Sequence, residues 1–235
     1  MRGAPRPKSY SSSSSSSSSN RRRAMTVKAK AIRRPARSAQ ELPAFDPAPS
    51  ARAGVEILEL AGVGYALVGR VAVWLYLPPE QHAYTKDVDF AVFHRDLGRI
   101  ARASVAKGFR PKPLSIGGFA VRGGPVTVDF VDRHPELSNL FAGAIRAARR
   151  SGPRFAVGKL KVPVVPKNYL IAMKIATMEE KDEKDAASLV MTISPAGYRA
   201  LRSFVRRQLG PLLALRLDAI ARRAGHAGAV RAEYR

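Results

Sequence analysis

The segment "TKDVDF" (residues 85–90) holds two carboxylates, Asp87 and Asp89, inside an otherwise apolar run. Residues i and i+2 of a β-strand face the same side, so the two acids project together while Val88 and Phe90 point into the core. Held about 5 Å apart, two carboxylates repel by roughly 3 kcal/mol at an effective dielectric constant near 20. Such a pair requires a cation, a raised pKa or plain solvation, and an exposed acid pair on an edge strand is the alternative to a site.

A third acid follows in "VTVDFVD" (126–132), where Asp129 shares a strand face with Thr127 and Val131 while Asp132 lies on the opposite face. If this strand neighbours the strand over 86–93, Asp129 joins Asp87 and Asp89. Three carboxylates converging from two strands form a site for hard cations, suited to one or two Mg²⁺ ions. Ions held in this way bridge phosphates and activate an attacking oxygen.

The composition narrows the chemistry. The chain has 235 residues and no cysteine, which excludes disulfides, a cysteine nucleophile and thiolate metal sites. Its four histidines show no metal-ligand spacing, so oxygen ligands are favoured. No stretch approaches 18 consecutive apolar residues, and nothing resembles a secretory apolar segment. We therefore expect a cytoplasmic protein with no membrane span.

The charge is strongly basic, with 41 Lys and Arg against 18 Asp and Glu, a net charge of +23. Residues 1–50 carry 11 basic and 2 acidic residues (+9), and the other 185 residues carry 30 and 16 (+14), so the excess is not confined to one end. A basic body predicts a polyanionic partner such as a nucleotide, RNA or DNA. The alternative is a surface that is simply rich in arginine and lysine.

Residues 1–52 are predicted to be a disordered basic leader, because the serine tract Ser11–Ser19 and the Pro/Ala/Arg-rich segment after it cannot bury apolar surface. This leader either contacts nucleic acid or is an extension without a function of its own. Translation could start at Met25 instead of Met1.

The rest of the chain mixes strands and helices and then turns helical. This order predicts an α+β fold, with a mixed sheet and flanking helices over residues 53–165 and a helical C-terminal region over 166–235. The strand signals lie at 65–70, 86–93, 117–121, 126–132 and 155–165, the helix signals at 55–61, 95–107, 136–149 and beyond 166, and residues 71–77 fit either. A hairpin is indicated between 117–121 and 126–132 by the turn residues at 122–125.

Gly69 adds a second kind of signal. It ends the apolar run "LVGR" (67–70), where a residue without a side chain lets the backbone approach a phosphate closely. A helix starting there would direct free N–H groups at an anion. A glycine followed by Asp-x-Asp 18 positions later is a stronger indication than either feature alone.

Together these residues resemble a known signature. "LVGRVAVWLY…TKDVDFAV" resembles the nucleotidyltransferase superfamily, in which a strand-borne Gly-Gly or Gly-Ser precedes a hydrophobic-Asp-x-Asp. The Thr-x-Asp-x-Asp form, from Thr85 to Asp89, is similar to the branch with minimal nucleotidyltransferases and AbiEii-type toxins. "VPKNYLIAMKIATMEEKDEKDAASLV" (165–190) is similar to that branch's helix with an internal lysine and its Lys-Asp-x-x-Asp stretch, and the likeness spans about residues 55–190.

The resemblance implies a role for each matching residue. Asp87 and Asp89 would be metal ligands, and Asp129 a third ligand or a base toward the acceptor hydroxyl. Gly69 would lie against the nucleotide phosphates and Lys174 would reach toward them. The far wall of the cleft would be formed by Lys181, Asp182 and Asp185, with Thr85 as part of the nucleotide-binding motif.

Two alternatives and one departure accompany these roles. Lys174 could be an exposed helix lysine, and residues 179–185 a solvated helix face. Position 70 is Arg where the family has Gly or Ser. Arg70 would either clamp the triphosphate or fill the phosphate pocket.

The expected function is transfer of a nucleoside monophosphate from an NTP such as ATP to a hydroxyl, with Mg²⁺ or Mn²⁺ as cofactor. RNA or tRNA is the expected acceptor, with a protein side chain or a small molecule as alternatives. The branch also implies a toxin role with an antitoxin partner. The competing hypotheses are a catalytically impaired nucleotide- or RNA-binding module of the same fold and a DNA-binding regulator that uses the basic C-terminal helices.

Overall fold

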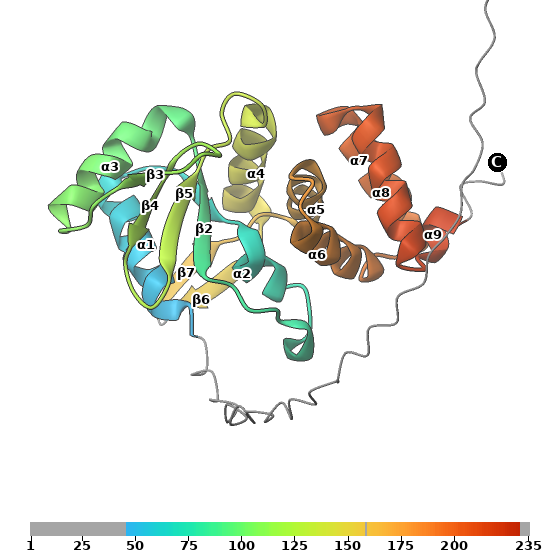
Figure 1. Cartoon of the computed structure of the whole chain (residues 1–235), viewed down its shortest axis with the longest axis horizontal. Helices are drawn as coiled ribbons and strands as arrows, with labels where there is room; N and C mark the ends of the chain where they lie inside the picture. The colour runs from blue at the N-terminus through green and yellow to red at the C-terminus, as the bar shows by residue number, and fades with distance from the viewer. Residues whose placement is uncertain (1–45, 158, 231–235) are drawn as a thin grey trace, which may run out of the picture. The chain divides into compact units, whose positions relative to one another are not determined.

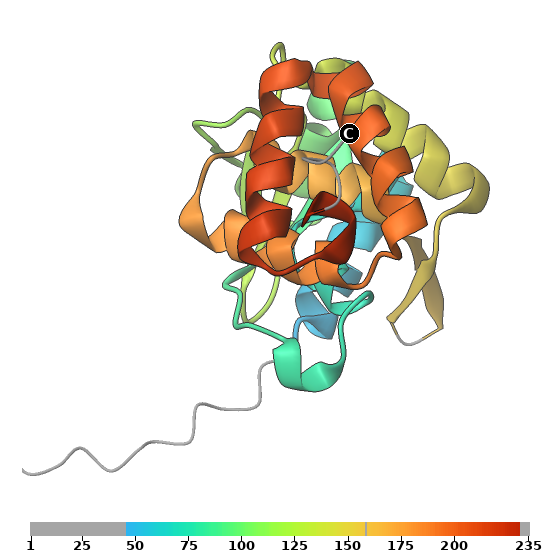
Figure 2. The same cartoon turned by 90° about the vertical axis from the view of Figure 1, so that its right-hand side faces the viewer.

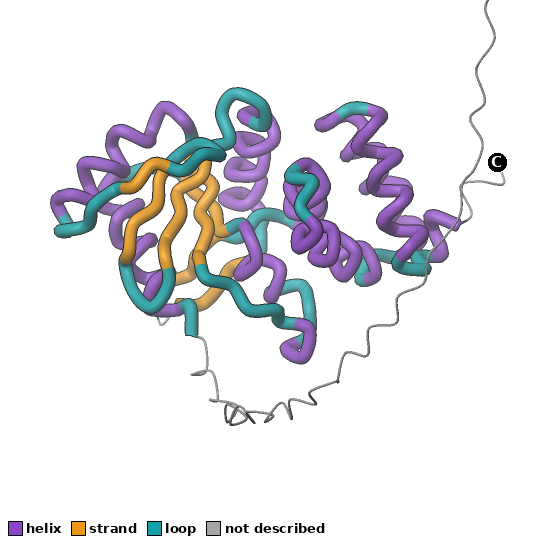
Figure 3. The backbone as a smooth tube through the Cα atoms, in the orientation of Figure 1, coloured by secondary structure: helices purple, strands orange, loops and turns teal. Residues whose placement is uncertain are grey.

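The two strands that carry the acids lie next to each other at the centre of a five-stranded sheet (Figures 1 and 3). The computed structural model describes residues 46–157 and 159–230, all of which belong to one compact unit. The strands run in the order β1 (Tyr65–Leu67), β2 (Asp87–Val92), β5 (Thr127–Val131), β4 (Phe119–Arg122) and β3 (Lys112–Pro113).

The pairing of β2 with β5 is parallel, whereas the other neighbouring strands of this sheet pair antiparallel. Phe90 lies opposite Phe130 in the register, and Asp89 lies opposite Asp129. Because side chains alternate along a strand, the two phenylalanines point to one face and the acids to the other. One register thus builds both the apolar core and the acidic face.

Helices α1 (Ala48–Ala61) and α3 (Leu97–Ala106) cover the apolar face of the sheet. Close packing is possible because Gly54 of α1 has no side chain; a Cβ there would lie 2.6 Å from the ring of Phe90. α1 ends at Gly62, which adopts a left-handed conformation with φ 61° and caps the helix with its backbone N–H.

The acidic face is bordered by α2 (Gly69–Trp74) and α4 (Ser138–Ser151). The hairpin β6 (Arg154–Val157) and β7 (Leu160–Pro163) joins the sheet edge through a bridge between Leu67 and Val164. Two short 3₁₀ helices, Pro79–Gln81 and His94–Asp96, flank β2.

The C-terminal part is helical and lies beside the sheet in Figure 1; Figure 2 shows these helices from the front, with the sheet behind them. It comprises α5 (Lys167–Ala176), α6 (Glu180–Met191), α7 (Pro195–Leu209), α8 (Pro211–Arg223) and α9 (Ala227–Val230). Ser194 caps α7 by accepting a hydrogen bond from the Gly197 N–H at 3.1 Å, with Pro195 in the first turn. Tyr198, buried between α7 and α8, donates to Asp218 at 2.8 Å.

The predicted fold class is confirmed: a mixed sheet with flanking helices is followed by helices, and β4 and β5 form the predicted hairpin. The segment 71–77, open between strand and helix, is helical through Trp74. The single strand predicted over 155–165 is wrong, because the chain reverses there and forms the hairpin of β6 and β7.

Residues 48–52, the last part of the predicted leader, are helical. α1 begins at Ala48 and buries Ser50 and Ala51, so these residues belong to the packed helix. The leader's first 45 residues lie outside the described residues, and the boundary near residue 165 stays a prediction. In the described part of the chain, no helix is long and apolar enough to cross a bilayer.

Candidate functional site

Asp87, Asp89 and Asp129 converge on the acidic face of the sheet, as the strand pattern predicts, and we call them the carboxylate cluster. Each offers a carboxylate oxygen, and these three oxygens lie within 4.8 Å of one another. The cluster lines a pocket of about 340 Å³ whose other wall is formed by α5 and the start of α6. The parallel pairing of β2 with β5 creates this arrangement, because it places Asp129 directly opposite Asp89.

The electrostatics of the cluster are unfavourable without a cation. Burial, followed by the charges of Asp87 and Asp129, raises the pKa of Asp89 to about 7. Burial and the charge of Asp87 also raise the pKa of Asp129 to about 6, against the opposing effects of the Thr127 hydroxyl and Lys86. The Oδ1 atom of Asp129 is buried and has no hydrogen-bond partner among the described residues. Three oxygen donors with this need for positive charge fit a hard divalent cation such as Mg²⁺ or Mn²⁺.

Thr85 and Gly69 hold two of these carboxylates in place. The buried Thr85 hydroxyl donates a hydrogen bond to Asp87 Oδ1 at 2.6 Å, which orients that carboxylate. Gly69 has φ 66°, and a Cβ at this position would overlap the carboxylate of Asp89. A glycine is required here for both its conformation and its lack of a side chain. Gly69 therefore contacts a carboxylate directly, in addition to the phosphate contact that the resemblance implies.

Opposite the cluster, two cations and two acids form a second group, which we call the ion network: Arg70, Lys174, Asp182 and Asp185. Lys174 Nζ lies 2.5 Å from Asp182 Oδ1 and 2.9 Å from Asp185 Oδ2. The Thr177 hydroxyl donates to Asp182 Oδ2 at 2.6 Å. Lys174 is 8% exposed, so it is a buried, paired lysine rather than the exposed helix lysine considered from sequence.

The two acids keep Lys174 charged. Burial by itself would lower the pKa of Lys174, but the charges and hydrogen bonds of Asp182 and Asp185 outweigh it and hold this pKa above its ordinary value. Burial acts in the opposite sense on Asp182, yet the pairing with Lys174 and Thr177 holds the pKa of Asp182 below its ordinary value. The lysine thus lines the pocket while its ammonium is bound to two carboxylates.

Arg70 joins three segments. Its Nε atom lies 3.3 Å from Asp185 Oδ2, its Nη1 donates to the Tyr84 carbonyl at 3.0 Å, and its Nη2 donates to the Lys181 carbonyl at 3.4 Å. The guanidinium therefore ties α2 to the segment before β2 and to α6. The side chain of Lys181 is more exposed and pairs with Glu179 at 3.1 Å.

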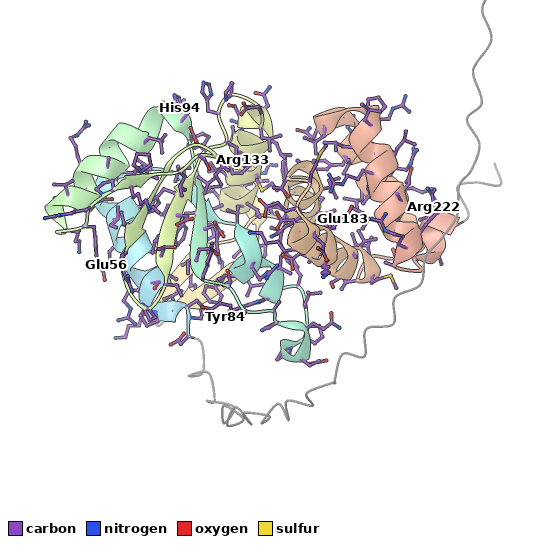
Figure 4. The ribbon with its side chains drawn as sticks, in the orientation of Figure 1. Glu56, Tyr84, His94, Arg133, Glu183 and Arg222 are labelled. Atoms are coloured by element: carbon purple, nitrogen blue, oxygen red, sulfur yellow. The ribbon has the colours of Figure 1, made fainter. Side chains whose placement is uncertain are left out.

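Arg133 and Asp132 also lie beside the site and were not among the predicted site residues. Arg133 follows β5 and lines the pocket, and Figure 4 shows it toward the upper end of the sheet, with Tyr84 toward the lower end. Asp132 stays outside the cluster, as its strand face predicts; it is buried and binds His94 Nδ1 at 2.6 Å through Oδ2. The sequence signal for Arg133 was its position immediately after the strand that bears Asp129.

Comparison with known proteins supports the fold. Neither a family model nor a curated protein sequence matches this chain. Among solved structures, the antibiotic-resistance factor ANT(2'')-Ia in solution is similar with a TM-score of 0.50 and 13% identity, over 68% of this chain and 91% of that one. A crystal structure of ANT(2'')-Ia with adenylyl-2''-tobramycin has a TM-score of 0.48 and 13% identity, over 67% and 95%.

A nucleotidyltransferase-like protein from Paracoccidioides brasiliensis has a TM-score of 0.42 and 16% identity, over 73% of this chain and 94% of that one. At such identities the likeness to the first structure concerns the fold. The chain therefore has a nucleotidyltransferase-like fold. The AbiEii-type branch stays a prediction.

Proposed function

We propose that this protein is a metal-dependent nucleotidyltransferase that transfers a nucleoside monophosphate from an NTP to an acceptor hydroxyl. The observation that carries the proposal is the carboxylate cluster. Its three acids come from two parallel strands, line a pocket and lack a contacting cation among the described residues. Such a cluster lowers stability by itself, and a site for Mg²⁺ or Mn²⁺ explains it better than packing does.

The reaction forms one bond and breaks one. The acceptor oxygen bonds to the α-phosphorus, the bond from the α-phosphorus to the oxygen that bridges to the β-phosphate breaks, and pyrophosphate leaves. The hydroxyl proton passes to Asp129 or to solvent. When bound, the metal ions supply charge neutralisation at the phosphates and a lower pKa for the attacking hydroxyl.

The chain's own residues position this chemistry. Asp87, Asp89 and Asp129 would hold the metal ions, with Asp129 Oδ1 free of other hydrogen bonds. The hydrogen bond from Thr85 restricts the rotation of Asp87, and Gly69 leaves room for the carboxylate of Asp89. Preorganised ligands of this kind lower the barrier because little rearrangement is needed during the reaction.

The helical wall would face the nucleotide. We infer that Lys174 and Lys181 contribute positive potential toward the phosphates, while Asp182 and Asp185 fix Lys174 at the pocket wall. Arg70 would hold this wall against the segment before β2 through its carbonyl contacts. A direct contact of Arg70 or Lys174 with phosphate would require an exchange of partners on binding.

The acceptor we favour is RNA, including tRNA, because the net charge of +23 favours a polyanion. A protein hydroxyl and a small molecule are the other acceptors to be tested. A toxin role follows from the resemblance to the AbiEii-type branch. Growth arrest by the wild type, but not by Asp87→Asn with Asp89→Asn, would support it, and an antitoxin should restore growth.

The test is the incubation of purified protein with α-labelled NTPs, Mg²⁺ or Mn²⁺, and RNA, protein or small-molecule fractions. We expect label transfer and pyrophosphate release that chelation with EDTA abolishes. The double variant Asp87→Asn/Asp89→Asn should be inactive, whereas Glu56→Gln, which changes a carboxylate at the exposed pair with Lys107, should behave as wild type. Equal activity of the double variant and the wild type would refute the catalytic role.

A second candidate is a binding module of the same fold without turnover. It is favoured by Arg70, because this residue lines the pocket where the resemblance calls for Gly or Ser. The same assay separates the two functions. A binding module would bind NTP or RNA in a salt-dependent manner and would release no pyrophosphate.

A further inference from the structure

The cations of the pocket fall into two groups. Arg70, Lys174 and Lys181 each pair with an acid. The side chains of Lys86 and Arg133, by contrast, make no hydrogen bond or ion pair with any residue that the structure describes. Among the pocket's lining residues, these two cations are therefore available to an anionic ligand.

Arg133 is held in an unfavourable backbone conformation. Its φ of 49° is left-handed, a region that non-glycine residues adopt at an energetic penalty of about 1–2 kcal/mol. The neighbouring residues fix this geometry: Asp132 is buried against His94, and the Leu137 N–H donates to the Arg133 carbonyl at 2.9 Å. The half-buried side chain lines the pocket, so the strained turn presents a cation to the site.

The surroundings of Arg133 differ from those of Arg70. Arg70 donates to the carbonyl of Tyr84. Both Tyr84 and Arg133 line the pocket, and Figure 4 shows Tyr84 toward the lower end of the sheet and Arg133 toward its upper end. Near Arg133 the lining residues contributed by β5, α4 and the loop before β4 are Val131, Phe141 and Ile116, with Asp129 as their single carboxylate. This end of the pocket therefore offers one free guanidinium, apolar surface and no acid besides the cluster itself.

We propose that Arg133 determines acceptor specificity by binding a phosphate group of the acceptor, which therefore carries a phosphate near the hydroxyl that attacks. This inference rests on the proposed nucleotidyltransferase function. A guanidinium binds phosphate through two parallel hydrogen bonds and is already charged, so it selects phosphorylated acceptors over neutral or polycationic ones. The phosphate could belong to the 3′ end of a polynucleotide or to a small phosphorylated molecule, because the recognition chemistry is shared.

The probes are a short RNA oligonucleotide with a free 3′ hydroxyl, a nucleoside 5′-monophosphate, the same nucleoside without phosphate, and an aminoglycoside. Wild type should use or bind one of the phosphorylated probes at least about 10-fold better than the nucleoside and the aminoglycoside. A preference for the oligonucleotide over the monophosphate identifies a polynucleotide as the source of the phosphate, and the reverse identifies a small molecule. Equal use of all four probes would overturn the proposal.

The variants are Arg133→Asn and Arg133→Lys. Asparagine tolerates the left-handed conformation, so Arg133→Asn removes the cation without adding backbone strain. It should raise the KM for the phosphorylated acceptor about 10-fold and leave the KM for NTP within about twofold, and Arg133→Lys should recover part of the loss. The control Arg122→Gln changes an exposed arginine at the end of β4 that is not a lining residue.

A rise in the KM for NTP with an unchanged acceptor KM would assign Arg133 to the nucleotide and overturn the proposal. Binding of the same four probes is measured by fluorescence anisotropy competition at fixed salt. This measurement tests the role of Arg133 independently of turnover. Absent turnover with phosphate-selective, Arg133-dependent binding refutes catalysis but retains the role of Arg133. Turnover without dependence on Arg133 retains catalysis and refutes that role.

Discussion

The carboxylate cluster and the ion network line the same pocket and solve the problem of buried charge in opposite ways. In the cluster, three acids share one face, and the pKa of Asp89 and the pKa of Asp129 both rise because charge is unfavourable there. In the network, Lys174 sits between two acids, and the pKa of Asp182 falls because charge is favoured.

This difference distinguishes charged residues that bind an ion from charged residues that hold helices and strands together. A group of like charges held together by a fold destabilises the folded state until an ion arrives, which is the property of a binding site. A balanced group satisfies itself and fixes its elements relative to one another. The cluster should thus respond to mutation mainly in activity, and the network mainly in stability.

The largest effect should come from Asp87→Asn and Asp89→Asn. We expect each to lower turnover by about 10³-fold, equivalent to about 4 kcal/mol of transition-state stabilisation. The unfolding free energy without metal should stay equal or increase by about 1 kcal/mol, because a repelling charge is removed. Steady-state kinetics and urea denaturation of the same samples measure both, and a large loss of stability would contradict the assignment as a metal site.

Lys174→Met should have the converse effect and lower the unfolding free energy by about 3 kcal/mol. The substitution leaves Asp182 and Asp185 largely buried without their shared cation. Lys184→Met is the control, because its ammonium pairs with Glu180 on an exposed face of α6, and its loss should amount to less than about 0.5 kcal/mol. Similar losses for the two variants in urea denaturation would show that the network contributes little.

Gly69→Ala reaches the cluster by steric means, with no change of charge. The new methyl group would overlap the carboxylate of Asp89, and alanine at φ 66° is strained. We expect about 2 kcal/mol of lost stability and a turnover about 10²-fold lower, because Asp89 must move. Gly108→Ala has a comparable φ of 80° with no atom near the added methyl, so it controls for backbone strain alone. Equal turnover of both variants would count against the role of Gly69.

The two regions should also give pH dependences of opposite sign. The folded-state pKa values of Asp89 and Asp129 are raised from 3.8 to about 7 and about 6, so between these limits the folded state binds more protons than the unfolded state. The stability of the metal-free protein should therefore fall as the pH rises from about 4 to about 7, because the folded state must release these protons. The pKa of Asp182 is lowered, so its contribution should be lost only below pH 3.8 as the pH falls through the folded value.

Urea denaturation from pH 3 to pH 8 checks the sign of both pH dependences, when the unfolding free energies of variants are compared with those of wild type. Asp89→Asn should flatten the slope between pH 4 and pH 7, and so should saturating Mg²⁺ with wild type. Asp182→Asn should change the pH dependence of the unfolding free energy only below about pH 4. A wild-type slope between pH 4 and pH 7 that Asp89→Asn leaves intact would show that the cluster does not cause it.

The carboxylate cluster could be predicted from the sequence because it depends mainly on the alternation of side chains within single strands. Alternation along two strands places Asp87 with Asp89 and separates Asp129 from Asp132, and both follow from side-chain direction alone. The parallel register that sets Asp89 opposite Asp129 pairs two distant segments. The local pattern does not show whether such segments are neighbours, so the sequence could predict the cluster only if they are. The β6–β7 hairpin was missed for a similar reason, because an apolar run does not reveal where the chain reverses.

The pairing within the network could not be predicted. The pattern placed Lys174 on a helix and Asp182 and Asp185 on the next, but which side chains meet depends on how α5 and α6 pack. Arg133 was missed as a pocket residue because its place there depends on a left-handed turn after β5, which residue type does not reveal.

The smallest effect should come from Arg70→Ser, which restores a residue that the resemblance calls for. Arg70 contacts Asp185 and two backbone carbonyls, while Asp185 also pairs with Lys174. Removing the guanidinium therefore leaves no acid without a cation, and we expect a loss of only about 1 kcal/mol in unfolding free energy.

Turnover of Arg70→Ser should stay within about threefold of wild type, because the side chain is engaged with protein acceptors on the pocket wall. A collapse of turnover with a raised KM for NTP would instead mark Arg70 as a triphosphate clamp. A large gain in turnover would mark it as a block in the phosphate pocket. Since Arg70 belongs to the network by its contacts and to the nucleotide motif by its position, this variant decides which of the two regions governs it.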